Sequence, residues 1–166
     1  MHCYDLYESP QGQMLLVAEG EGLSGVYFDG QKYLPRVEPD WRRDARHAPL
    51  RQAKRELAEY FGGERKRFET ELTPEGTPFQ QSVWKAISTV GFGEIITYSE
   101  LARRAGYLGS ARAAGAATGR NPIGIIVPCH RIVGSNGSLT GYAGGLDRKR
   151  ALLALESGIP ELLAAA

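Results

Sequence analysis

Hydrophobic and polar positions alternate along the first third of the chain in three short runs. These runs read CYDLYE, MLLVAE and LSGVYF, and the segments SPQG and EGEG separate them. A period of two residues is typical of strands that bury one face, and segments rich in Gly and Pro favour turns. The pattern therefore predicts three strands. A helix is expected next, at about 50–61, with Leu50, Ala53, Leu57 and Phe61 on its buried face.

After the polar link TELTPEGTP the spacing of apolar residues becomes that of helices. We therefore expect two domains, an N-terminal α/β domain at 1–75 and a C-terminal domain at 76–166, in an α/β (α+β) fold. Thr77, Pro78 and Gln80 are typical of a capping box at a helix start. Two short helices near 99–106 and 110–119 favour a helix-turn-helix, although an ordinary helical hairpin fits these features equally well.

The last part of the chain predicts a turn and one more helix. Asn136-Gly137 is a two-residue hairpin signal. A final helix is expected at 147–157, with Asp147 as its N-cap and Gly158 as its stop.

Composition limits the class of protein. The 166 residues are 42% hydrophobic and 23% charged, with a formal net charge of +1, as in ordinary globular domains. No apolar run approaches the roughly 18 residues of a membrane span, and no signal peptide is recognisable. Two cysteines give no disulfide framework. We therefore expect a soluble, monomeric intracellular protein, cytoplasmic or, in a eukaryote, nuclear.

Charge is distributed unevenly between the halves. Residues 1–75 hold 11 Lys and Arg against 14 Asp and Glu, a net of −3, whereas residues 76–166 hold 9 against 5, a net of +4. A mildly basic second half is compatible with a polyanionic partner, and equally with an ordinary solvated face.

The segment IVPCHRIVG places two chemically reactive side chains, Cys129 and His130, inside an aliphatic run. Ionisable groups are costly in such surroundings unless they are paired. Neighbours on an extended strand point to opposite faces, so a direct contact would need a bend, for which Pro128 gives a reason. Glu156 lies beside the apolar face of the last helix and is a candidate partner for His130. A Cys–His–Glu relay is one interpretation; a buried structural thiol and a surface carboxylate paired with Lys149 or a loop arginine are the other.

Other site types find less support. His2, Cys3 and His47 do not have the spacing of a zinc motif, and no Cys-x-x-Cys is present. The glycine-containing segments GYAGG and EGEG lack the residues of a phosphate-binding loop. We therefore expect neither a metal site nor a cofactor.

Further motifs surround the cysteine in a characteristic order. They are FQQSVWKAI, GEIITYSELA, ARAAG, RNP, PCHR and TGYAGGLDRKRALLALE. Together they make the segment from Thr77 to Glu156 resemble the catalytic lobe of the O6-alkylguanine-DNA alkyltransferases, also called methylated-DNA–protein-cysteine methyltransferases. The strand-rich first lobe is similar to the ribonuclease H-like domain of that family.

The resemblance implies a role for each matching residue. Cys129 would accept the alkyl group, His130 would be its water-mediated base, Glu156 would orient His130, and Asn121 would brace the active-site turn. Tyr98 would donate to guanine N3, and Arg112 would fill the space left by an extruded base. The residues implied in the guanine pocket are Tyr98, Val127, Ile132, Tyr142, Ala143 and Gly144. Those implied in DNA contact are Tyr98, Ser99, Ser110, Ala111, Arg112, Arg120 and Arg131.

The resemblance also implies the reaction. The base would be rotated out of double-stranded DNA, and its alkyl group would pass irreversibly to Cys129, so that each chain reacts once. Leu108 and Ala114 depart from the residues common in the family, which affects the turn and the packing expected there. Ala143 stands where serine is common, and this change is tolerated if the backbone N–H at that position bonds guanine O6. The alternative is a sensor that binds alkylated bases through a helix-turn-helix without repairing them, and a cysteine hydrolase is a weaker one.

Overall fold

The computed structural model of the protein describes residues 1–158, which form two compact units. The first unit contains Met1–Glu75 together with Pro122–Gly124, and the second contains Gly76–Asn121 and the chain from Ile125 onward. The chain leaves the first unit after Glu75 and returns to it for residues 122–124. The return of three residues to the first unit has no counterpart in the sequence pattern.

The first unit is built on a four-stranded sheet. Its strands are β1 (His2–Ser9), β2 (Gly12–Glu19), β3 (Gly22–Phe28) and β4 (Arg42–Arg43). The order is β3-β2-β1-β4; β1, β2 and β3 are antiparallel, and β4 runs parallel to β1. The three predicted strands are all present, joined by two-residue turns.

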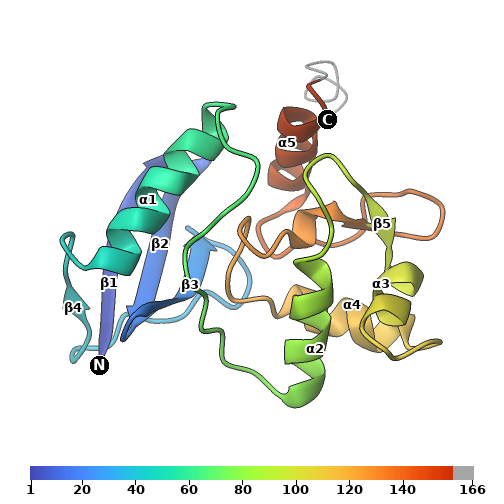
Figure 1. The fold of residues 1–166 in the computed structure, drawn as a ribbon, viewed down its shortest axis with the longest axis horizontal. Coiled ribbons are helices and arrows are strands. Elements are labelled where there is room, and N and C mark those ends of the chain that lie inside the picture. Colours follow the sequence, from blue (N-terminus) through green and yellow to red (C-terminus); the bar gives the residue numbers. More distant parts are fainter. Residues whose placement is uncertain (159–166) are drawn as a thin grey trace. The chain divides into compact units, whose positions relative to one another are not determined.

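Helix α1 (Ala48–Phe61) packs on this sheet and closes the core of the first unit (Figure 1). Leu50, Ala53 and Leu57 are fully buried, as predicted. Near the end of the helix the buried aromatic residue is Tyr60 and not the predicted Phe61, which is half-buried. The buried face of α1 also includes Pro49 and Glu56. In a helix of 3.6 residues per turn, position 60 lies near the centre of this wider face and position 61 lies at its margin.

The outer edge of β3 is covered by two separate segments. The backbone N–H of Leu23 donates to the carbonyl of Glu71 (2.8 Å), and the backbone N–H of Val26 donates to the carbonyl of Pro122 (2.9 Å). Gly124 donates in turn to Val26 (3.0 Å). These bonds satisfy backbone groups that an open sheet edge would expose. They also fix the chain immediately after Asn121.

The second unit is mostly helical. Its elements are α2 (Pro78–Ile87), β5 (Ile96–Thr97), α3 (Tyr98–Arg104), α4 (Ala111–Gly119), η1 (Cys129–Arg131), β6 (Ile132–Val133) and α5 (Leu146–Ser157). The capping box at Thr77 is present, with both of its hydrogen bonds. The indole of Trp84 donates to the carbonyl of Ala117 (2.8 Å) and ties α2 to α4. Figure 1 shows α2, α3 and α4 grouped together.

A short parallel pair brings two distant segments together. Ile96 of β5 lies opposite Ile132 of β6. Because Tyr98 follows β5 and Cys129 precedes β6, this pairing places the two side chains in one region of the second unit.

Two expectations about the end of the chain were wrong. Helix α5 begins at Leu146 with Gly145 as its N-cap, so Asp147 lies in the first turn. The turn at Asn136-Gly137 forms, with Gly137 at φ +80°, but no strand follows it in the part of the chain that is described, because β6 pairs with β5 instead. Gly158 ends α5 in the left-handed conformation, as expected.

Among residues 1–158 no helix has the length and apolar character needed to cross a membrane.

Candidate active site

The backbone around Cys129 is bent. Pro128 has φ −82° and ψ 63°, and the N–H of Cys129 donates to the carbonyl of Val127 (2.8 Å), which is an inverse γ-turn. Cys129, His130 and Arg131 then form a single turn of 3₁₀ helix. The run is therefore not the extended strand that its aliphatic residues indicate, and neighbouring side chains are not forced to opposite faces.

The thiol of Cys129 is buried, and within residues 1–158 its side-chain hydrogen-bond partner is Asn121. The side-chain amide of Asn121 donates to its sulfur (3.2 Å) and also to the carbonyl of Val127 (2.9 Å). The same amide thus braces the turn and contacts the thiol. Burial raises the pKa of Cys129, against smaller lowering effects from Asn121 and the cationic Lys149. At neutral pH the sulfur is therefore protonated, and its ionisation needs a base.

Glu156 joins two buried side chains of the 3₁₀ turn. Its carboxylate contacts Nε2 of His130 (2.7 Å) and accepts two bonds from the guanidinium of Arg131 (both 2.8 Å). Arg131 also donates to the carbonyl of Val90 (2.7 Å). All three side chains are buried. Glu156 is therefore not the surface carboxylate of the alternative interpretation, although it does pair with an arginine, Arg131, as well as with His130.

His130 faces Glu156 with one ring nitrogen and leaves the other unpaired. Since a carboxylate accepts, Nε2 carries the proton, and Nδ1 carries the lone pair of a neutral ring. Nδ1 is buried without a hydrogen-bond partner among the described residues. Burial lowers the pKa of His130, although Glu156 opposes this. The imidazole is therefore neutral near pH 7, with a lone pair that can accept a proton.

Lys149 is a buried residue of the site that the sequence interpretation missed. Its ammonium donates to the carbonyls of Ile132 (2.6 Å), Thr140 (2.9 Å) and Gly141 (3.2 Å). Burial lowers the pKa of Lys149 to about 8. The side chain ties α5 to β6 and to the start of the 140–145 loop. Its spacing was a usable signal, because Lys149 lies seven positions before Glu156 on the same helix face.

Two tyrosines of the expected pocket lie near the sulfur. Burial raises the pKa of Tyr98 and raises that of Tyr142 further, and in both cases negative charge at Cys129 adds to the shift. Both hydroxyls therefore stay protonated at neutral pH. The ring of Tyr98 also faces α4, since a Cβ added to Gly115 would lie 3.6 Å from it.

The remaining pocket candidates fall into two groups. Val127 and Ile132 are buried on either side of the 3₁₀ turn. Ala143 and Gly144 are half-buried in the loop that Lys149 and Arg148 hold, the latter by a bond to the carbonyl of Gly144 (3.2 Å). A separate hollow of about 280 Å³ includes Glu156 in its lining but none of the predicted pocket residues.

The candidates for DNA contact are mostly on the surface. Arg112, Arg120 and Ser99 are exposed, whereas Ser110 and Ala111 are half-buried at the start of α4. Arg112 has no ion pair or side-chain hydrogen bond within residues 1–158. Arg131 is the exception: its guanidinium is buried and bonded to Glu156, so it cannot present these donors to a phosphate.

Comparison with known proteins extends over both units. Residues 2–74 match the family described as 6-O-methylguanine DNA methyltransferase, ribonuclease-like domain, and residues 78–158 match the corresponding DNA binding domain. A methylated-DNA–protein-cysteine methyltransferase of Methanosarcina acetivorans is 48% identical over 92% of this chain and 97% of that protein. One of Mycobacterium tuberculosis is 46% identical over 92% and 91%. A crystal structure of Mycobacterium tuberculosis OGT in complex with DNA matches with a TM-score of 0.86 at 43% identity, over 95% of this chain and 94% of that chain.

Proposed function

Because the chain belongs to the 6-O-methylguanine DNA methyltransferase family, we propose that it repairs O6-alkylguanine in DNA by moving the alkyl group to Cys129. One observation carries the assignment to this residue. The buried thiol of Cys129 is followed in sequence by His130, a neutral histidine whose Nε2 is held by the buried carboxylate of Glu156. This arrangement supplies a nucleophile, a base and a group that orients the base.

The protonation states favour a reaction in which the proton leaves the thiol as attack begins. The raised pKa of Cys129 and the lowered pKa of His130 give a resting pair of thiol and neutral imidazole. The proton passes to Nδ1 of His130 through a bridging water. The imidazolium is then stabilised by Glu156, and the sulfur by the Asn121 amide and the Lys149 cation.

The chemical step is an in-line displacement at the alkyl carbon. A carbon–sulfur bond forms, the bond from carbon to guanine O6 breaks, and its electron pair stays on the base. Tyr98 donates a hydrogen bond to guanine N3, and its raised pKa keeps it in the donor form. The product thioether has no regenerating group nearby among the described residues. Each chain therefore reacts once.

DNA is bound by the helix pair α3–α4. Three features of these two helices support this. Its exposed side chains are small apart from Arg112 and the arginine that caps it, Arg120. The hydroxyl of Ser110 makes no capping bond, so it can donate to a phosphate, as can the first N–H groups of the helix. Ser99 and Ala111 lie at the starts of the two helices. Arg112 enters the space of the extruded base. The repair activity takes place where the chromosomal DNA is, in the cytoplasm or, in a eukaryote, in the nucleus.

The reaction can be separated from the sensor and the hydrolase by one titration. Full-length protein is incubated with increasing duplex carrying a labelled O6-methylguanine, and label on protein and label released are counted. We expect protein-bound label to level off at one group per chain. Binding without transfer would support the sensor, and released label in excess of protein would support the hydrolase.

A further inference from the structure

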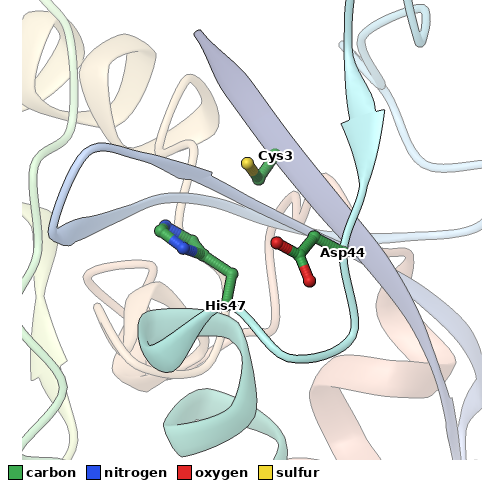
Figure 2. Close-up of side chains that lie close together, drawn as sticks. All are labelled: Cys3, Asp44 and His47. Carbon is green, nitrogen blue, oxygen red and sulfur yellow. The ribbon is translucent and has the colours of Figure 1, made fainter.

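A second cluster of chemically active side chains lies in the first unit, outside the site described above. The side chains of Cys3, Asp44 and His47 lie close together, as Figure 2 shows. The thiol sulfur, a carboxylate oxygen and a ring nitrogen all lie within 4.8 Å of one another. Cys3 is buried, and the other two are half-buried.

Three elements bring these residues together. Cys3 lies on β1 opposite Arg42 of β4, and Asp44 follows directly after β4. His47 is the N-cap of α1, and its N–H donates to the carbonyl of Asp44 (3.3 Å). Asp44 and His47 are therefore three positions apart on one tight turn, a spacing from which two side chains can reach the same ion.

The hydrogen bonds around the cluster are those found around metal ligands. Nε2 of His47 lies 2.8 Å from the carbonyl of Gly20, which can only accept, so Nε2 carries the proton and Nδ1 the lone pair. A histidine ligand is commonly oriented in this way by a backbone carbonyl. The N–H of Arg46 donates to Oδ1 of Asp44 (3.0 Å) and holds the carboxylate. The guanidinium of Arg42, 3.5 Å from Oδ2, is exposed and can move aside.

We propose that Cys3, Asp44 and His47 form a binding site for one divalent cation of the zinc class. Thiolate, imidazole and carboxylate are the ligands that Zn²⁺ uses in proteins, and three of them leave one position for water. A thiolate and a carboxylate would balance the charge of the ion. The ion would join β1, the end of β4 and the start of α1, and so stabilise the first unit.

The proposal departs from the sequence expectation of no metal site. That expectation considered His2, Cys3 and His47, whose spacing matches no motif. Asp44 was not considered, and the β1–β4 pairing that brings Cys3 to the turn is a long-range contact. The side chain of His2 lies elsewhere, stacked on Trp41 with ring centroids 4.8 Å apart.

Direct metal binding tests the proposal. Reduced, metal-free full-length protein is titrated with Co²⁺, whose bonds to thiolate give near-ultraviolet absorption, and then with Zn²⁺ as competitor. We expect one equivalent to bind, and saturating Zn²⁺ to raise the Tm by about 5 °C or more. Absence of the thiolate band and of a Tm shift in the wild-type protein would overturn the proposal.

Variants locate the ion. Cys3→Ser should abolish the thiolate band, and Asp44→Asn and His47→Gln should each weaken binding at least about tenfold. Cys129→Ser and His2→Ala are the matched controls and should bind as the wild type does. Asp44→Asn leaves the buried thiol in place, so the test survives if Cys3→Ser folds poorly. A band that persists in Cys3→Ser and disappears in Cys129→Ser would assign the metal to the other thiol and refute the proposal.

Discussion

The two cysteines of the chain are buried to a similar degree, Cys3 at 7% exposure and Cys129 at 6%, yet they lie in different surroundings. Cys129 has an amide donor at 3.2 Å, a cationic Lys149 nearby and a neutral histidine as its neighbour in sequence. Cys3 has a carboxylate and an imidazole within 4.8 Å.

The difference shows that burial alone does not determine what a thiol does. Around Cys129, His130 can accept the thiol proton, and Asn121 and Lys149 can stabilise the negative charge that forms on the sulfur during the reaction. Around Cys3 lie a carboxylate and an imidazole, and together with the thiol these are ligand types that Zn²⁺ uses in proteins. The first environment fits a nucleophile and the second fits a metal ligand.

The largest expected effect is loss of transfer in Cys129→Ala. Duplex binding should remain within about a few-fold of wild type, because it rests on the helix pair and the phosphates. Cys3→Ala is the matched control and should transfer a full equivalent. Both are measured by covalent labelling and by DNA titration. Stoichiometric transfer by Cys129→Ala would contradict the assignment of Cys129, and not Cys3, as the alkyl acceptor.

The next effect concerns the base. Glu156→Gln should slow transfer by about 10²-fold, because His130 loses the carboxylate that stabilises its charged form. It should also reduce the free energy of unfolding by about 3 kcal/mol, since the guanidinium of Arg131 is left buried without its partner. Single-turnover kinetics and denaturant unfolding measure the two quantities.

Arg131→Met is the control for Glu156→Gln. It breaks the same ion pair and keeps the bond between His130 and Glu156. We expect a similar loss of stability and a much smaller change in rate. Equal slowing in the two variants, after correction for the folded fraction, would make Glu156 a packing residue only.

A smaller effect is expected at the DNA surface. Arg112→Ala should slow repair of duplex about tenfold, because part of the few kcal/mol of base extrusion is no longer offset. Reaction with free O6-benzylguanine, which needs no extrusion, should be unchanged. Arg103→Ala removes an equal charge, one that is paired with Glu100 on α3, and serves as control. Equal losses of Arg112→Ala on both substrates would refute the extrusion role.

The smallest effect is a pH dependence of stability. The pKa of His130 is lowered below 6.5 in the folded protein, so the unfolded chain binds the proton first as pH falls. Stability is therefore complete above pH 6.5 and declines below it, by at most about 1.4 kcal/mol per pH unit. Urea unfolding between pH 5 and 7 should show this slope in wild type and lose it in His130→Gln. An unchanged slope in the variant would show that other groups cause it.

Local features of the fold could be predicted from the sequence because short-range rules decide them. The capping box at Thr77, the glycine stop at Gly158 and the face of α1 through Leu50 and Leu57 depend on residues within a turn or two. The start of α5 was displaced because an acidic residue suits the first turn as well as the cap.

Long-range pairings could not be predicted in the same way. The bond of Arg131 to Glu156 spans 25 residues, and its DNA role was inferred from resemblance without knowledge of burial. Lys149 contacts three carbonyls that no periodicity identifies. The inverse γ-turn at Pro128 was foreseen only as a bend, because its form depends on the Asn121 amide that holds it.

The most direct test of the account is to locate the transferred group. Wild-type protein is reacted with one equivalent of duplex containing O6-methylguanine, digested, and examined by peptide mass spectrometry. We predict one added methyl group per chain, on the peptide that carries Cys129, and an unmodified peptide carrying Cys3. A methyl group on Cys3, on both cysteines or on neither would contradict the account.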